Sequence, residues 1–191
     1  DMVKFTKNGS TAVTAAVKLA RAYTGKNLVL RCRQHLFFSY DDWFIGSTNI
    51  SRGIPDEIKK MTYQFNFNDI ENLKKIISTY KNKIACIVME PATDVCPKIL
   101  KKDTSCCEKI SCARSYSKIK KINYLQKVEK LCKKNNILFI LDEMITGFRW
   151  NIGGAQKIFG LDPDLSTFGK AMANGYSVSC VAGKRDIMNL G

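Results

Sequence analysis

Asn8-Gly9-Ser10-Thr11 is the first of three segments whose residue types could do chemistry, and it stands directly before a predicted helix. Gly9 allows the backbone to approach a ligand closely, and Ser10 and Thr11 add hydroxyl donors. The free N–H groups and the dipole of a helix start favour a phosphate group. The alternative is that Ser10 is an ordinary N-cap of the helix.

The other two segments carry a carboxylate and an amine. Asp142 follows the apolar run Ile137–Leu141, so it either meets a cation or a ligand at the strand end or caps the next turn. Lys170 is one of 24 lysines, but Gly169 precedes it, small residues follow it, and both flanks resemble strands. We expect Lys170 to be buried, where its amine can form a Schiff base.

In chain order, a phosphate cradle, a strand-end aspartate and a buried lysine are the parts that pyridoxal phosphate chemistry needs. The cradle holds the phosphate, and the aspartate keeps the pyridine nitrogen protonated so that the ring accepts electrons. The lysine holds the cofactor and then transfers protons. Together the three segments therefore point to pyridoxal 5′-phosphate as the cofactor.

Apolar strands that alternate with amphipathic helices must position these residues. The expected strands are Val3–Thr6, Leu28–Leu30, Ile84–Met89, Ile137–Leu141, Leu165–Phe168 and Val178–Ala182. The expected helices have an apolar face from Val13 to Tyr23 ended by Gly25, an Asn68 cap with a helix to about Tyr80, Tyr124–Asn135, and a short helix opened by Gly153-Gly154. This alternation predicts an α/β fold with a mainly parallel sheet and ligands at the strands' carboxyl ends.

Composition limits the class of protein. The 191 residues are 45% hydrophobic and 25% charged, which is typical of a globular domain. No apolar run approaches the ~20 residues that span a bilayer, so we expect no membrane protein. The net charge is +14, with 24 of the 31 basic residues being lysine. Diffuse basicity explains that charge better than a nucleic-acid surface, which more often clusters arginine.

The eight cysteines indicate a reduced, cytoplasmic protein. Half of them lie in or beside apolar segments, where a thiol behaves as a small hydrophobe: Cys32, Cys86, Cys132 and Cys180. The others lie in residues 96–121, which we interpret as a basic, cysteine-rich surface insertion: Cys96, Cys106, Cys107 and Cys112. They lack paired spacing and His35 is the single histidine, so we expect no metal site.

Four motifs, in order, resemble the class III, fold-type-I aminotransferases, and among them the branch similar to glutamate-1-semialdehyde 2,1-aminomutase. The matching segments are Phe-Thr-Lys-Asn-Gly-Ser-Thr within residues 5–25, Ile-Val-Met-Glu-Pro (87–91), Leu-Asp-Glu-Met-Ile-Thr-Gly-Phe-Arg (141–149) and Phe-Gly-Lys-Ala-Met-Ala-Asn-Gly-Tyr (168–176). The resemblance covers nearly the whole chain except residues 96–121. It implies a three-layer α/β/α domain and a pyridoxal-phosphate-dependent enzyme.

The resemblance also assigns roles by position. Gly9, Ser10 and Thr11 match the phosphate-binding turn, Asp142 the partner of the pyridine nitrogen, and Lys170 the Schiff-base lysine. Met144 matches the apolar residue, usually valine, that packs on one face of the ring. Phe37 matches a stacking aromatic residue, while Phe38 replaces the histidine that commonly follows it. His35 falls two residues early and receives no role.

Several departures leave the substrate open between a small amine and an amino acid. Thr11 stands where an acidic residue is usual, and the glycine and asparagine common after Glu90-Pro91 are missing. Family members are also longer, with an N-terminal segment, a C-terminal small domain and a homodimeric active site. Residues 1–191 are therefore expected to be an incomplete, central part of the cofactor-binding large domain. The alternatives are an inactive or truncated member, or a non-catalytic basic protein that binds RNA through the insertion.

Overall fold

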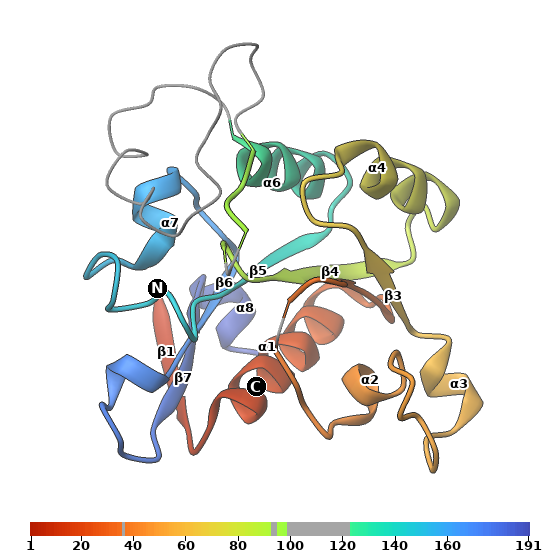
Figure 1. The fold of residues 1–191 in the computed structure, drawn as a ribbon. Helices are drawn as coiled ribbons and strands as arrows, with labels where there is room; N and C mark the ends of the chain where they lie inside the picture. The colour runs from red at the N-terminus through yellow and green to blue at the C-terminus, as the bar shows by residue number, and fades with distance from the viewer. Residues whose placement is uncertain (36, 93–94, 99–122) are drawn as a thin grey trace.

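The computed structural model describes residues 1–35, 37–92, 95–98 and 123–191, and shows one seven-stranded sheet between helices (Figure 1). The strands are β1 (Met2–Thr6), β2 (Leu28–Cys32), β3 (Thr62–Phe65), β4 (Ile84–Met89), β5 (Leu138–Asp142), β6 (Leu165–Phe168) and β7 (Ser179–Gly183). The helices are α1 (Gly9–Thr24), α2 (Asp42–Ile45), α3 (Asp56–Lys59), α4 (Ile70–Thr79), α6 (Tyr124–Lys134), α7 (Gly154–Phe159), the 3₁₀ turn η2 (Lys170–Met172) and α8 (Arg185–Met188).

The strand order is β1-β7-β6-β5-β4-β2-β3. The neighbours from β3 through β2, β4 and β5 to β6 pair in parallel, whereas β7 is antiparallel to both β6 and β1. The predicted α/β class with a mainly parallel sheet is confirmed. Because β1 and β6 both oppose β7, the carboxyl ends of β1, β2, β4, β5 and β6 share one edge of the sheet. β7 begins at that edge.

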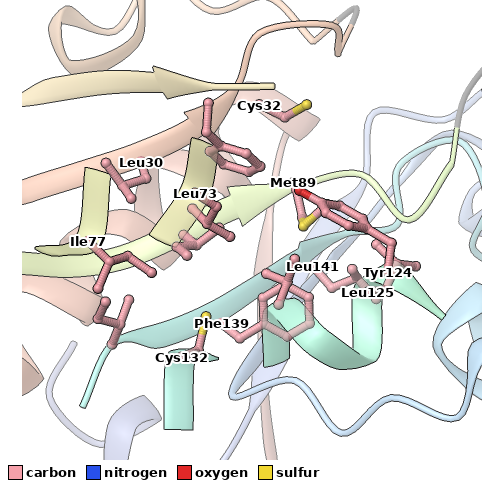
Figure 2. Packing of buried hydrophobic residues seen from close by; sticks show 14 of the residues in the cluster. Leu30, Cys32, Leu73, Ile77, Met89, Tyr124, Leu125, Cys132, Phe139 and Leu141 are labelled. Atoms are coloured by element: carbon pink, nitrogen blue, oxygen red, sulfur yellow. The ribbon is translucent and has the colours of Figure 1, made fainter. Parts of the chain in front are cut away.

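Two hydrophobic cores fill the spaces between the three layers. On one face, α4, α6 and α7 pack on the central strands; in Figure 2, Leu73 and Ile77 of α4 lie opposite Phe139 of β5 and Cys132 of α6. On the other face, α1, α2 and α8 pack on the same strands through residues such as Val17. The predicted three-layer α/β/α arrangement is confirmed.

Two helix starts differ from the sequence prediction. The N-cap of α1 is Asn8 and not Ser10, because Asn8 has the extended backbone that a cap needs while Ser10 is already helical. The N-cap of α4 is Asp69 and not Asn68. Asn68 has a left-handed backbone (φ 62°), which is incompatible with a cap. Its side chain instead binds the carbonyl of Cys96 and the N–H of Lys98.

Only residues 95–98 at the start of the proposed insertion are described. The rest of the insertion lies outside the described residues, including Cys106, Cys107 and Cys112, so the insertion remains a prediction. Within the described ranges, no helix has both the length and the apolar composition that crossing a bilayer requires.

Candidate active site

A cavity of about 370 Å³ opens at the edge where the strands end. Residues of six of the seven strands, or of the segments that follow them, line it: Asp142 ends β5, Ser179 begins β7, and the others follow β1, β2, β4, β5 and β6. Its lining comprises Asn8, Gly9, Ser10, Phe37, Phe38, Glu90, Asp142, Met144, Ile145, Lys170 and Ser179. Six of the seven predicted site residues thus lie around one space, and Thr11 is the one outside the lining.

The start of α1 presents backbone N–H groups to this cavity. The Asn8 side-chain oxygen accepts from the N–H of Thr11 at 2.9 Å and from the Thr11 hydroxyl at 3.0 Å. The Asn8 carbonyl accepts from the N–H of Ala12. Among the described residues, this leaves the N–H groups of Gly9 and Ser10 for a ligand. The Ser10 hydroxyl donates to the carbonyl of Phe38 at 3.1 Å, which joins α1 to the aromatic wall.

Met144 lies between two glycines. A Cβ atom on Gly9 would stand 2.8 Å from the Met144 sulfur, and one on Gly169 would stand 2.7 Å from the same atom. A side chain at either position would force the Met144 thioether to move, and glycine avoids this displacement. Met144 itself is 5% exposed and forms part of the cavity lining. Its thioether is therefore held in one place by the backbone on either side.

Asp142 is the last residue of β5 and is 2% exposed. Its Oδ1 accepts two hydrogen bonds of 3.0 Å, one from the N–H of Met144 and one from the hydroxyl of Thr167. Burial raises the pKa of the Asp142 carboxyl group from 3.8 to about 6, while these two bonds and the charge of Lys170 oppose the rise. The group can therefore change its protonation near neutral pH.

Lys170 lines the cavity, but the prediction that it is buried is wrong: its side chain is exposed. The reason is its position beyond β6, at the first residue of the short turn η2 on the open edge of the sheet. Its backbone is left-handed (φ 43°). This backbone conformation is uncommon for residues other than glycine and persists only where the surrounding structure imposes it.

An aromatic group forms one wall of the cavity. Phe37 lies nearly parallel to Trp43, with ring centroids 6.3 Å apart, and meets Phe44 edge-on at 4.9 Å. The Trp43 indole donates to the hydroxyl of Thr14, which donates to Asp41 at 2.6 Å. This chain of bonds fixes the aromatic segment on α1.

Glu90 and Ser179 line the cavity although the sequence analysis gave them no role. Glu90 is 3% exposed and directly follows β4, and its N–H donates to His35 Nδ1 at 2.8 Å. His35 thus fixes the backbone at the end of β4. The signal for Glu90 was available, because it follows a wholly apolar strand as Asp142 does. Ser179 had no such signal, since it begins an antiparallel strand.

Comparison with known proteins identifies the family of this chain. The sequence model described as Aminotransferase class-III matches residues 1–191. The chain belongs to the class-III aminotransferases. A 3-aminobutyryl-CoA aminotransferase of Cloacimonas acidaminovorans is 35% identical over 190 residues, which are 100% of this chain and 40% of that protein. A glutamate-1-semialdehyde 2,1-aminomutase of Francisella philomiragia is 34% identical, covering 98% of this chain and 41% of that protein.

Solved structures agree with the family assignment. An omega-transaminase from Sphaerobacter thermophilus matches with a TM-score of 0.76 and 25% identity, over 98% of this chain and 42% of that one. The pyridoxal-phosphate internal aldimine form of FumI from Sphingopyxis matches with a TM-score of 0.73 and 25% identity, over 100% of this chain and 41% of that one. The class-III aminotransferase chain described here therefore spans about two fifths of the length of its relatives.

Proposed function

We propose that the protein transfers amino groups with pyridoxal 5′-phosphate as its cofactor. The observation that carries this proposal is the meeting of the α1 start, Asp142 and Lys170 around one cavity. Relatives named as aminotransferases and aminomutases, at 34–35% identity, support the same reaction class. When bound, the cofactor supplies a carbonyl that reacts with amines and a ring that accepts electrons from the substrate.

The residues around the cavity fit this group. The Gly9 and Ser10 N–H groups and the dipole of the 16-residue helix α1 suit its phosphate. Met144 and Phe37 offer apolar surface for the two ring faces, as a flat aromatic ligand requires. Asp142, buried and charged, is suited to hold the proton on the ring nitrogen. Lys170 Nζ would hold the cofactor and carry a proton to and from the substrate. Thr11, outside the lining, would act only through Asn8.

Substituting the lysine tests the proposal. We expect the purified protein to take up pyridoxal phosphate with a visible absorbance band that sodium borohydride fixes covalently, and Lys170→Ala to retain no covalent cofactor. Lys130→Ala, which removes an exposed lysine of α6, is the matched control and should behave as the parent protein. A parent protein without uptake, or a Lys170→Ala protein with the same fixed band, contradicts the proposal.

Two versions of the reaction remain as proposals. In one, the amino group of a small amine or amino acid passes to a separate carbonyl compound. In the other, amino and carbonyl groups exchange within one molecule, as the names of the aminomutase relatives imply. Conversion of glutamate-1-semialdehyde with no added amino acceptor supports the second version. A strict need for a separate acceptor supports the first.

We further propose that the protein works in the cytoplasm as a homodimer. Among the described residues, four buried cysteines are free thiols, which suits a reducing compartment: Cys32, Cys86, Cys132 and Cys180. The exposed Lys170 at the cavity mouth suits a site that a second subunit completes. Light scattering of the purified protein tests the dimer, and a monomer that takes up the cofactor stably contradicts it.

A further inference from the structure

Thr167 carries a buried hydroxyl group within the sheet. It is 0% exposed on β6, and the parallel register places it directly opposite Asp142 on β5. Its Oγ1 donates to Asp142 Oδ1 at 3.0 Å. Valine has nearly the same shape and favours a buried strand, so packing alone does not require threonine at this position.

Both described hydrogen bonds to the Asp142 carboxylate reach Oδ1, and they come from two different elements. The N–H of Met144 approaches from the turn after β5, and the Thr167 hydroxyl approaches from β6. Two donors on one oxygen fix the rotation of the carboxylate, and Asp142 lines the cavity. The Met144 donor belongs to the backbone and is independent of side-chain identity. Thr167 is therefore the side chain that sets how Asp142 faces the cavity.

We propose that Thr167 is a positioning residue that holds the Asp142 carboxylate in the orientation that the cofactor ring nitrogen needs. The inference rests on the proposed function, because it takes the ring as the ligand of Asp142. Thr167 acts through Asp142 and touches neither cofactor nor substrate. Only its hydroxyl matters in this role, so serine should replace it and valine should not.

The burial and the charges around Asp142 make the hydrogen bond from Thr167 important for the pKa of the Asp142 carboxyl group. On its own segment, Glu143 raises the pKa of the Asp142 carboxyl group, and Lys170 beyond β6 lowers it. Among the described residues, the other ionisable groups that line the same two cavities as Asp142 are Glu90 after β4 and, from β2 and the residues after it, Arg31, Cys32 and His35. Burial is the largest influence and raises the pKa to about 6. Removing a hydrogen bond to the charged form raises it further, by about one unit for a bond of ordinary strength.

The test compares Thr167→Val with Thr167→Ser and with Thr62→Val. Thr62 is also a buried strand threonine, but its hydroxyl donates to the carbonyl of Trp43 at 2.6 Å, away from Asp142. Two quantities are measured: the Asp142 carboxyl titration by ¹³C NMR without cofactor, and the dissociation constant of pyridoxal phosphate from pH 5 to pH 9. Neither measurement depends on turnover.

For Thr167→Val we expect the Asp142 titration to move up by about one pH unit and cofactor binding to weaken by about tenfold at neutral pH. The acidic limit of binding should move up with the titration. Thr167→Ser should restore both, and Thr62→Val should lower stability without changing either. An unmoved titration in Thr167→Val, or equal effects of Thr62→Val, overturns the positioning role alone. A parent protein that binds no pyridoxal phosphate overturns the proposed function as well.

Discussion

Asp142 illustrates, at the scale of one residue, how a buried carboxylate affects stability. Burial raises the pKa of its carboxyl group from 3.8 in an exposed setting to about 6. The native state therefore binds the proton more tightly than the unfolded state between these values, and stability falls as pH rises from about 4 to about 6. A difference of two units corresponds to ~3 kcal/mol at neutral pH. A positive ring beside the carboxylate would return part of that free energy.

Replacing this carboxylate should therefore separate stability from binding. We expect Asp142→Asn to raise the free energy of unfolding of the cofactor-free protein at pH 7.5 by about 2 kcal/mol, since no buried charge remains. At pH 4 the two proteins should be nearly equal, because Asp142 is then protonated in the native state and about half protonated in the unfolded state. Chemical denaturation at the two pH values measures this difference.

The same substitution should weaken cofactor retention, because an amide holds no proton on a ring nitrogen. Asp162→Asn is the control, since Asp162 is exposed.

A parent protein whose stability is flat between pH 4 and pH 7 would show that Asp142 is not buried as a carboxylate.

Glu143 and α7 show how a short element is anchored. Glu143 is fully buried. Its carboxylate accepts hydrogen bonds from the hydroxyl of Thr146 and from the N–H groups of Ala155 at 2.9 Å and Gln156 at 2.7 Å. Its carboxylate thereby satisfies the first free N–H groups of α7. Gly154, at the start of this helix, has φ +75°, and a Cβ there would stand 2.6 Å from Glu143 Oε1.

Two glycine substitutions separate backbone strain from this contact. Gly25 also has a positive φ (+65°), but a Cβ there meets nothing within 4 Å. We expect Gly25→Ala to destabilise the protein by about 1 kcal/mol, the cost of the left-handed conformation alone. Gly154→Ala should cost at least ~3 kcal/mol, because the methyl group also displaces a buried carboxylate. Thermal and chemical denaturation measure both, and equal losses would contradict the role assigned to Glu143.

Uniform burial makes the bounds of a strand predictable from its sequence. Ile84–Met89 is apolar at every position and buried at every position, so the sequence predicts both of its bounds. β3 was missed because it has four residues of mixed polarity at the sheet border. α2 was missed because its four residues lie in an aromatic stretch without helical period.

The site was predictable in part for the same reason. A strand end and a helix start can be read from consecutive residues, which is how Gly9, Ser10 and Asp142 were found. The Thr167–Asp142 bond and the seat of Met144 between Gly9 and Gly169 depend on the register of neighbouring strands. Register across a parallel sheet is not written in any local pattern, so these contacts needed the structure.

At the scale of the whole molecule, sheet topology explains how distant residues form one cavity. Residues from Asn8 to Ser179 meet because the five strands that precede them end, and β7 begins, at the same edge. A helix dipole, a buried carboxylate and an exposed amine are thereby brought together with no contribution from the opposite edge.

The net charge of +14 is a property of the whole molecule, and it is the basis of the alternative function, RNA binding. Residues 99–121 contain seven basic and two acidic residues, a net +5, so most of the charge lies elsewhere. If the basicity is diffuse, deleting residues 99–121 should leave pyridoxal phosphate uptake unchanged. Retention on RNA at low salt should be weak and equal for unrelated RNA sequences. The deletion should reduce this retention only partly, and should lower its salt dependence in proportion to the charge removed. Filter binding across a salt series measures this. Tight, sequence-selective binding that the deletion abolishes would instead assign the segment an RNA-binding role.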